Sequence, residues 1–169
     1  MMGTVKPVKR SVAVIVWRPA GQAGGEAPGE SAFLIVRRPD DPGDPLAGAW
    51  GLPAATLLDG EDERAAVVRA GRVKLGVRLA PGARVGEKTA DRGGYLLRLA
   101  DYEAEILDGV PAVPQPGRPV TQYTECRYTA DPGALAEAAA RGSLCAQVFL
   151  GDLARGSQAR SGRRPGAGG

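Results

Sequence analysis

Two continuous apolar runs lie in the N-terminal part of the chain. The first, Ser11–Arg18 (SVAVIVWR), is rich in β-branched residues and lacks polar alternation, which is typical of a central strand covered on both faces. The second is Ala32–Val36 (AFLIV). A glycine-rich segment, 21–31, separates them. We therefore predict a hairpin with an unusually long, mobile loop.

An amphipathic pattern over residues 62–75 predicts a helix. Acidic residues precede it, and negative charge is favoured at a helix N-terminus, where Asp59 is the expected N-cap. Gly71 lies mid-helix and costs about 1 kcal/mol relative to alanine. The residues expected to pack inward are Ala65, Ala66, Val68, Ala70, Val73 and Leu75.

The second half of the chain predicts further strands and a helical end. Strands are expected at 84–89, 95–105 and 122–130. Acids at 101, 103 and 105 alternate onto one face of the middle strand, which we interpret as a solvated face. Ala134–Arg141 favours a helix, and a short helix with Cys145 and Phe149 follows.

The composition predicts one domain with a proper core. The chain has 169 residues, of which 43% are hydrophobic, and we place the domain at 9–152. Residues 1–8 are a loose end, and the arginine- and glycine-rich tail 153–169 is expected to be disordered. The net charge is +3, but four tail arginines supply more than that, leaving 18 basic against 19 acidic residues in 1–152. The composition thus gives no indication of a nucleic-acid-binding body.

Histidine is absent and cysteine is rare. This excludes a standard structural zinc site, a Ser-His-Asp triad and a Cys-His dyad. Cys126 and Cys145 are interpreted as buried thiols in a reducing compartment, so a cytoplasmic location is expected. The apolar run 12–17 is too short for a membrane span, and no small-residue cleavage site follows it.

The segment Trp50–Val77 (WGLPAATLLDGEDERAAVVRAGRVKLGV) predicts a short strand, a tight loop and a helix. It resembles the Nudix box of the Nudix hydrolases, G-x5-E-x7-R-E-U-x-E-E-x-G-U, where U is a bulky aliphatic residue. Glu61 falls on the first glutamate, Arg69 on the arginine and Gly76-Val77 on the closing pair, while Ala55 replaces the opening glycine. The resemblance covers about residues 10–150 and implies an α/β fold, a Nudix-type α/β/α sandwich with a mixed β-sheet.

The resemblance departs from the family at the metal ligands. Nudix hydrolases cleave nucleoside diphosphate-linked compounds with Mg²⁺ or Mn²⁺, held by glutamates whose positions here carry Ala70, Val73 and Lys74. A divalent ion ~4 Å from the lysine charge would be repelled by roughly 8 kcal/mol at an effective dielectric near 20. No metal is therefore expected at the standard positions.

Our first hypothesis is a Nudix-fold protein with lost or weak metal-dependent catalysis that binds a nucleotide-like phosphate ligand. Lys74 brings a cation to the place where metal-bound phosphate would sit, with Arg37, Arg38 and Arg69 as helpers. Tyr123 is a candidate for stacking a nucleobase. Each helper has a structural alternative: a solvated strand end for Arg37 and Arg38, pairing with Glu61 for Arg69, and core packing for Tyr123.

Two other hypotheses stay open. An active Nudix hydrolase would need metal or catalytic carboxylates at new positions, drawn from Glu61, Glu63, Glu103, Glu105 and Glu125. An interaction or regulatory module would use the same fold without any small ligand.

Overall fold

The framework of the protein is a mixed four-stranded sheet. In the computed structural model, which describes residues 3, 5–18, 31–117 and 122–161, the strand order is β4-β1-β6-β5. β1 runs parallel to β6 and antiparallel to β4, and β5 pairs antiparallel with β6. These strands are β1 (Val8–Val16), β4 (Ala54–Thr56), β5 (Arg78–Asp91) and β6 (Leu96–Asp108). The predicted mixed sheet and the central position of the first apolar run are confirmed.

A second, three-stranded sheet lies beside it and replaces the predicted hairpin. Its order is β3 (Trp50–Gly51), β2 (Phe33–Arg37), β7 (Glu125–Thr129), all antiparallel. β1 and β2 do not pair along their lengths. They are joined at the bridge between Trp17 and Phe33 and by the hydrogen bond from the Arg18 amide to the Ala32 carbonyl, while β1 pairs with β4 and β6 and β2 pairs with β3 and β7. The hairpin prediction was wrong, and its loop lies almost wholly outside the described residues.

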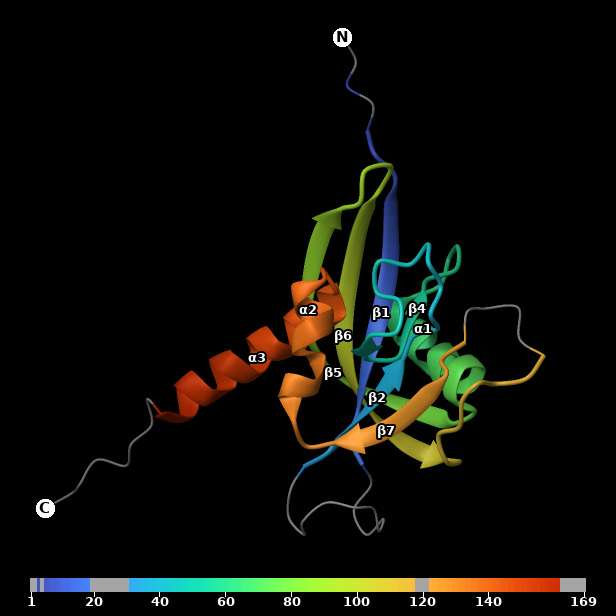
Figure 1. Ribbon diagram of the computed structural model, residues 1–169, viewed down its shortest axis with the longest axis vertical. Helices are drawn as coiled ribbons and strands as arrows, with labels where there is room; N and C mark the ends of the chain where they lie inside the picture. Colours follow the sequence, from blue (N-terminus) through green and yellow to red (C-terminus); the bar gives the residue numbers. More distant parts are fainter. Residues whose placement is uncertain (1–2, 4, 19–30, 118–121, 162–169) are drawn as a thin grey trace, which may run out of the picture.

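Helices cover the four-stranded sheet on both faces (Figure 1). α1 (Glu63–Ala70) continues into a π-helical segment, Gly71–Leu75, on one side. A 3₁₀ turn, Pro132–Leu135, precedes α2 (Ala136–Ala140), and α3 (Leu144–Ser161) follows on the other side. The chain is an α/β/α sandwich, as the resemblance implied.

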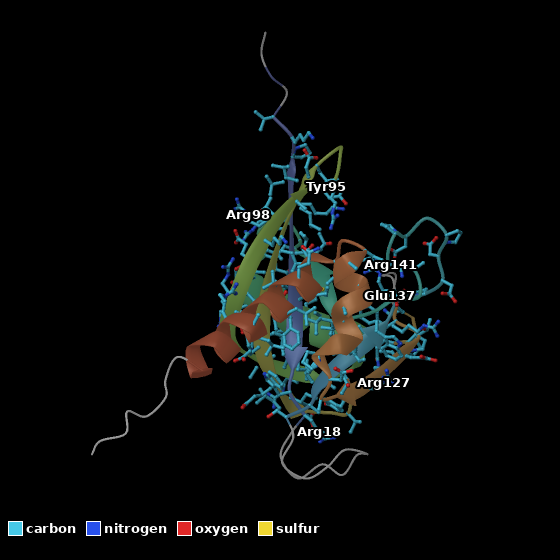
Figure 2. The ribbon with its side chains drawn as sticks, turned by 60° about the vertical axis from the view of Figure 1, so that its left-hand side comes forward. Arg18, Tyr95, Arg98, Arg127, Glu137 and Arg141 are labelled. Carbon is cyan, nitrogen blue, oxygen red and sulfur yellow. The ribbon has the colours of Figure 1, made fainter. Side chains whose placement is uncertain are left out.

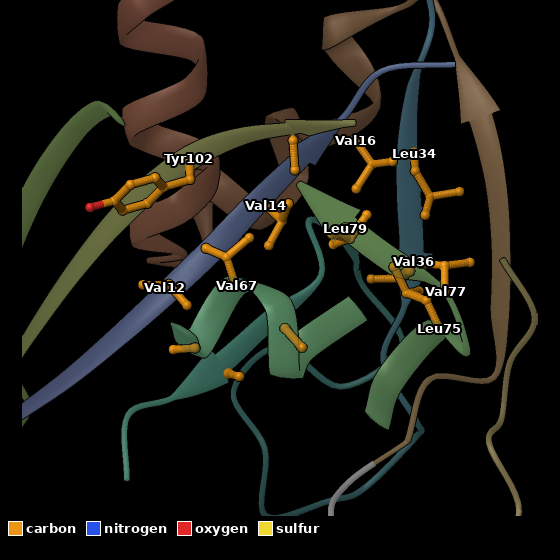
Figure 3. Packing of buried hydrophobic residues seen from close by; sticks show 14 of the residues in the cluster. Val12, Val14, Val16, Leu34, Val36, Val67, Leu75, Val77, Leu79 and Tyr102 are labelled. Atoms are coloured by element: carbon orange, nitrogen blue, oxygen red, sulfur yellow. The ribbon is translucent and has the colours of Figure 1, made fainter. Parts of the chain in front are cut away.

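The alternation of side chains along β1 explains the two layers. Val12, Val14 and Val16 face the core that contains Val67 of α1 (Figure 3). Ala13 and Ile15, on the opposite face, belong to a second core formed with α2 and α3. Successive strand residues point to opposite faces of a sheet, so an uninterrupted apolar run supplies both cores.

The N-cap of α1 lies three residues later than predicted, although the helix itself starts at Glu63, one residue after the predicted start. Asp62, rather than Asp59, is the N-cap, and its side chain accepts a hydrogen bond from the Ala65 amide. A turn at Gly60, with φ of 76°, separates Asp59 from the helix. The inward face is rotated accordingly, with Val67 fully buried and Val68 40% exposed.

Two other predictions fail in the C-terminal half. Residues 153–161 are helical, because α3 continues to Ser161 and Leu153 extends its apolar face onto the core. The predicted disordered tail is therefore wrong for these residues, and 162–169 lie outside the described part. Asp101 has no exposed surface, because α3 packs over the strand face that was expected to be solvated.

A helix able to cross a membrane is absent from the described ranges, since none there combines sufficient length with apolar character.

Candidate ligand-binding site

A cavity of about 730 Å³ opens where the two sheets meet the 40–49 loop and the start of α3. Its apolar lining includes Trp50, Leu52, Leu97 and Leu99. Among the described residues that line it, one side chain is a carboxylate, that of Asp44. Six lining side chains are cationic. They come from β1, α1, the π-helical segment and the residues that directly follow β2, β5 and α2: Lys9, Arg38, Arg69, Lys74, Arg92 and Arg141.

Lys74 lies on the cavity wall above an aromatic ring. Its Nζ is 5.2 Å from the centroid of the Tyr123 ring, within the range of a cation–π contact. Burial lowers the pKa of Lys74, and the nearby charges of Arg38 and Arg69 lower it further. The ammonium thus lies in a locally electropositive environment, and a bound anion would reduce the repulsion among the cations.

Tyr123 is fixed by its hydroxyl group. It is 4% exposed, accepts a hydrogen bond from the Ala54 amide at 2.8 Å, and donates to the Ala54 carbonyl at 3.3 Å. Burial raises the pKa of Tyr123 to about 12. This geometry favours the packing role over nucleobase stacking, with the ring supporting Lys74.

Arg69 connects the box helix to the loop before it. It donates two hydrogen bonds of 2.9 Å to the Glu61 carboxylate and one of 2.6 Å to the Thr56 carbonyl. The Arg69 hydrogen bonds lower the pKa of Glu61 against the opposing effect of burial, and the Leu58 amide assists. The side chain therefore braces the loop and lines the cavity.

Arg37 and Arg38 point in different directions. Arg38 lines the cavity and contacts Asp44 at 2.6 Å, whereas Arg37 donates to the Gly48 carbonyl and lies 3.8 Å from Glu125. Adjacent residues at a strand end face opposite sides of the sheet, so only one of the pair reaches the cavity.

The five candidate acids do not converge. Glu61 pairs with Arg69, and Glu63 lies near another opening, where it contacts Arg84 at 3.1 Å and accepts from the Tyr102 hydroxyl at 2.8 Å. Glu103 and Glu105 lie on β6 and Glu125 on β7. In the part of the chain that the structure describes, no three His, Cys, Asp or Glu side chains group as a metal site would require.

One of the helix positions that would carry the family's ligands, and the position after it, are built into the core. Ala70 has no exposed surface. A Cβ on Gly71 would lie 2.6 Å from Leu79 Cγ, so the Leu79 side chain fills the space of the missing aliphatic residue. Gly71 therefore permits a close approach of β5 to the helix. This packing offsets the low helix propensity of glycine.

Sequence reasoning missed four charged residues of the cavity, Lys9, Asp44, Arg92 and Arg141. Arg141 projects from the end of α2 beside the 40–49 loop (Figure 2) and donates to the carbonyls of Pro45 and Ala47. Arg92 donates to the Gly142 carbonyl. These contacts join segments far apart in sequence, and no local pattern signals them.

Known proteins resemble this chain in fold. The solved Escherichia coli ORF135 protein matches with a TM-score of 0.60 and 19% identity, covering 88% of this chain and 94% of that one. The MutT protein of Methanosarcina mazei Go1 matches with a TM-score of 0.60 and 18% identity, covering 96% and 100%. The chain therefore has the fold of these proteins, which a Nudix hydrolase of Nitrosomonas europaea also shares, at TM-score 0.59 and 18% identity over 89% and 90% of the two chains. Another match of the same fold is the C. elegans Ap4A hydrolase, at TM-score 0.58 and 16% identity over 86% and 98% of the two chains.

The chain also matches a curated sequence. It is 40% identical over 81 residues to a Mycobacterium tuberculosis protein, in strains CDC 1551 / Oshkosh and H37Rv, named "Putative 8-oxo-dGTP diphosphatase 2". The match covers 46% of this chain. It covers 55% of the relative, so the chain spans about half of the relative's length. No protein-family model matches the chain.

Proposed function

We propose that this Nudix-fold chain binds a nucleotide-like anionic ligand in the cavity without requiring a divalent metal. The observation that carries the proposal is the charge of the described lining, six cations against one carboxylate. Lys74 is central because it occupies a glutamate position of the Nudix box. An ammonium group there can neutralise phosphate charge directly. In Nudix hydrolases a metal ion held by glutamates has that role.

The volume and lining of the cavity fit a ligand with both a phosphate and an apolar part. Its volume of about 730 Å³ lies within the usual range for small-molecule sites. Apolar and aromatic side chains, among them Trp50 and Leu97, line it together with the cations. The names of the relatives, which refer to 8-oxo-dGTP and Ap4A, support a nucleotide as the ligand class.

Standard metal-dependent hydrolysis is proposed to be lost or weak. The cation at Lys74 repels a divalent ion, and Ala70 and Val73 offer no oxygen ligand. An active hydrolase with relocated acids would need several carboxylates near the cavity, and Glu61 is already paired with Arg69. The separation of the five acids in the fold argues against that alternative.

Thermal unfolding tests the proposal. The protein is heated alone, with dGTP and EDTA, with Mg²⁺, and with dGTP and Mg²⁺ together. We expect dGTP to raise the melting temperature in EDTA, since a ligand at a hundred times its dissociation constant adds ~2.7 kcal/mol. Stabilisation only when metal and nucleotide are combined would favour the relocated-acid hydrolase, and no shift under any condition would favour the interaction module.

A pair of lysine variants tests the role of Lys74. Lys74→Met keeps an unbranched side chain beside Tyr123 but removes the ammonium that lies over its ring, and we expect dGTP binding to weaken about tenfold or more. Lys88→Met is the matched control, because Lys88 contacts Gln147 outside the cavity lining. Equal dGTP affinity of the Lys74 variant and the parent would refute the assigned role.

A further inference from the structure

The single carboxylate of the described cavity lining, Asp44, is held against one of the cations. Its Oδ2 lies 2.6 Å from Arg38 Nε, and its Oδ1 accepts a hydrogen bond from the Leu46 amide at 2.9 Å. The side chain of Asp44 is 15% exposed, against 37% for Arg38. The contact therefore lies at the cavity wall, with the carboxylate the more buried partner.

Asp44 is ionised near neutral pH. Burial acts to raise its pKa, but the Leu46 amide, the Arg38 hydrogen bond and the charges of Arg38 and Arg141 together hold the pKa below its usual value. Its Oδ2 occupies the Arg38 guanidinium where an oxygen of a phosphate group would otherwise bind.

The backbone of the 40–49 loop keeps the carboxylate in place. Arg141 Nη2 donates to the Pro45 carbonyl at 2.7 Å and to the Ala47 carbonyl at 3.1 Å. Arg37 Nε donates to the Gly48 carbonyl at 3.1 Å, and the Asp44 amide itself donates to the Asp41 carbonyl at 2.9 Å. These bonds hold the backbone on both sides of the Asp44 side chain and keep its carboxylate beside Arg38.

We infer that Asp44 is a built-in competitor for the anionic ligand, which occupies Arg38 until a phosphate group displaces it. The inference rests on the proposed function and adds an affinity-setting residue to that site. A small anion that contacts only Arg38 gains little by replacing a tethered carboxylate. A nucleotide makes further contacts with Lys74 and the apolar lining, so it can displace Asp44 with a net gain in free energy.

The test compares two acid-to-amide variants in the same loop. Asp44→Asn keeps an Oδ1 acceptor for the Leu46 amide and removes the charge. Asp41→Asn is the matched control, because Asp41 Oδ1 likewise accepts from a loop amide, that of Gly43, but lies exposed outside the cavity lining. Calorimetric titration with dGTP in EDTA is expected to give about three- to tenfold tighter binding for Asp44→Asn and no change for Asp41→Asn.

A double-mutant cycle identifies the cation that Asp44 blocks. In an Arg38→Met background, the gain from Asp44→Asn should vanish, because the two side chains act as one pair. If Asp44→Asn still increases dGTP affinity in the Arg38→Met background, the competitor role is wrong, and Asp44 acts through general repulsion of the nucleotide. If Arg38→Met does not fold, the comparison of the two amide variants decides alone.

The outcomes separate this inference from the proposed function. If the parent binds dGTP but Asp44→Asn binds it equally or more weakly, the competitor role is wrong and the binding site stands. If neither the parent nor any variant binds dGTP, the proposed function itself fails, and the competitor role fails with it.

Discussion

Asp101 offers a quantitative test of the packing between α3 and the sheet. It lies in β6 between Ala13 of β1 and Gly86 of β5, and it has no exposed surface. Neither carboxylate oxygen has a hydrogen-bond partner among the described residues. Burial, with a smaller contribution from the charge of Asp152, raises the pKa of Asp101 to about 8. The side chain is therefore a neutral acid in the folded protein at neutral pH.

The sign and size of the effect on stability follow from the two pKa values. The unfolded chain loses this proton near the ordinary value of 3.8, whereas the folded chain keeps it to about 8. Between these values the unfolded state binds fewer protons, so the free energy of unfolding falls by about 1.4 kcal/mol per pH unit. From about pH 5 to about pH 7.5, Asp101 should remove roughly 3 kcal/mol of stability.

Urea unfolding of the parent and of Asp101→Asn at these two pH values measures the effect. The variant cannot titrate at this position, so its stability should fall by roughly 3 kcal/mol less than that of the parent over the interval. The test compares the change in unfolding free energy between the two pH values in the parent with the same change in the variant. The cost of burying the amide and the titration of other groups cancel in this comparison. Parallel pH dependence of the two proteins would refute the buried neutral carboxyl.

Asp91→Asn is the matched control for Asp101. Asp91 is exposed, and hydrogen bonds from Lys6 and from the Gly93 amide lower its pKa, so it is ionised across the interval in both states. The variant should therefore follow the pH dependence of the parent.

Two further substitutions test local packing and pairing. Gly71→Ala should lower the free energy of unfolding by about 1–3 kcal/mol in urea titrations, because the added methyl group meets Leu79. Helix propensity alone predicts the opposite, a gain in stability. A stabilised variant would therefore contradict the packing argument. Glu61→Gln should reduce stability by about 1 kcal/mol at neutral pH. Since Arg69 lowers the pKa of Glu61, that contribution is present above pH 4.5 and is lost as the pH falls through the folded value, so parent and variant should converge in acid.

The sequence predicted those parts of the fold that depend on local pattern. The apolar run at 12–16 requires burial on both faces, and it forms the central strand of the sandwich. Alternation alone cannot show which face of a strand a distant helix covers, and Asp101 was misplaced for that reason. The continuation of α3 past residue 152 was missed because its stability comes from packing of Leu150 and Leu153 rather than from composition.

The candidate site was predictable in part, from the box and from residues near the ends of strands. The spacing of the box led to Arg69 and Lys74, and the strand end led to Arg38, and all three line the cavity. Asp44 and Arg141 lie almost a hundred residues apart, and they meet because α2 packs beside the 40–49 loop. Such a contact depends on the tertiary fold, which no window of sequence contains.

The contact between Gly71 and Leu79 also bears on how the chain could be redesigned. A bulky aliphatic residue at 71 would collide with Leu79, and a glutamate at position 70 would enter a fully buried site in the core. Either change toward the metal-binding box is therefore destabilising unless its neighbours change as well. A complete metal-binding box could thus be built on this helix only through several coordinated substitutions.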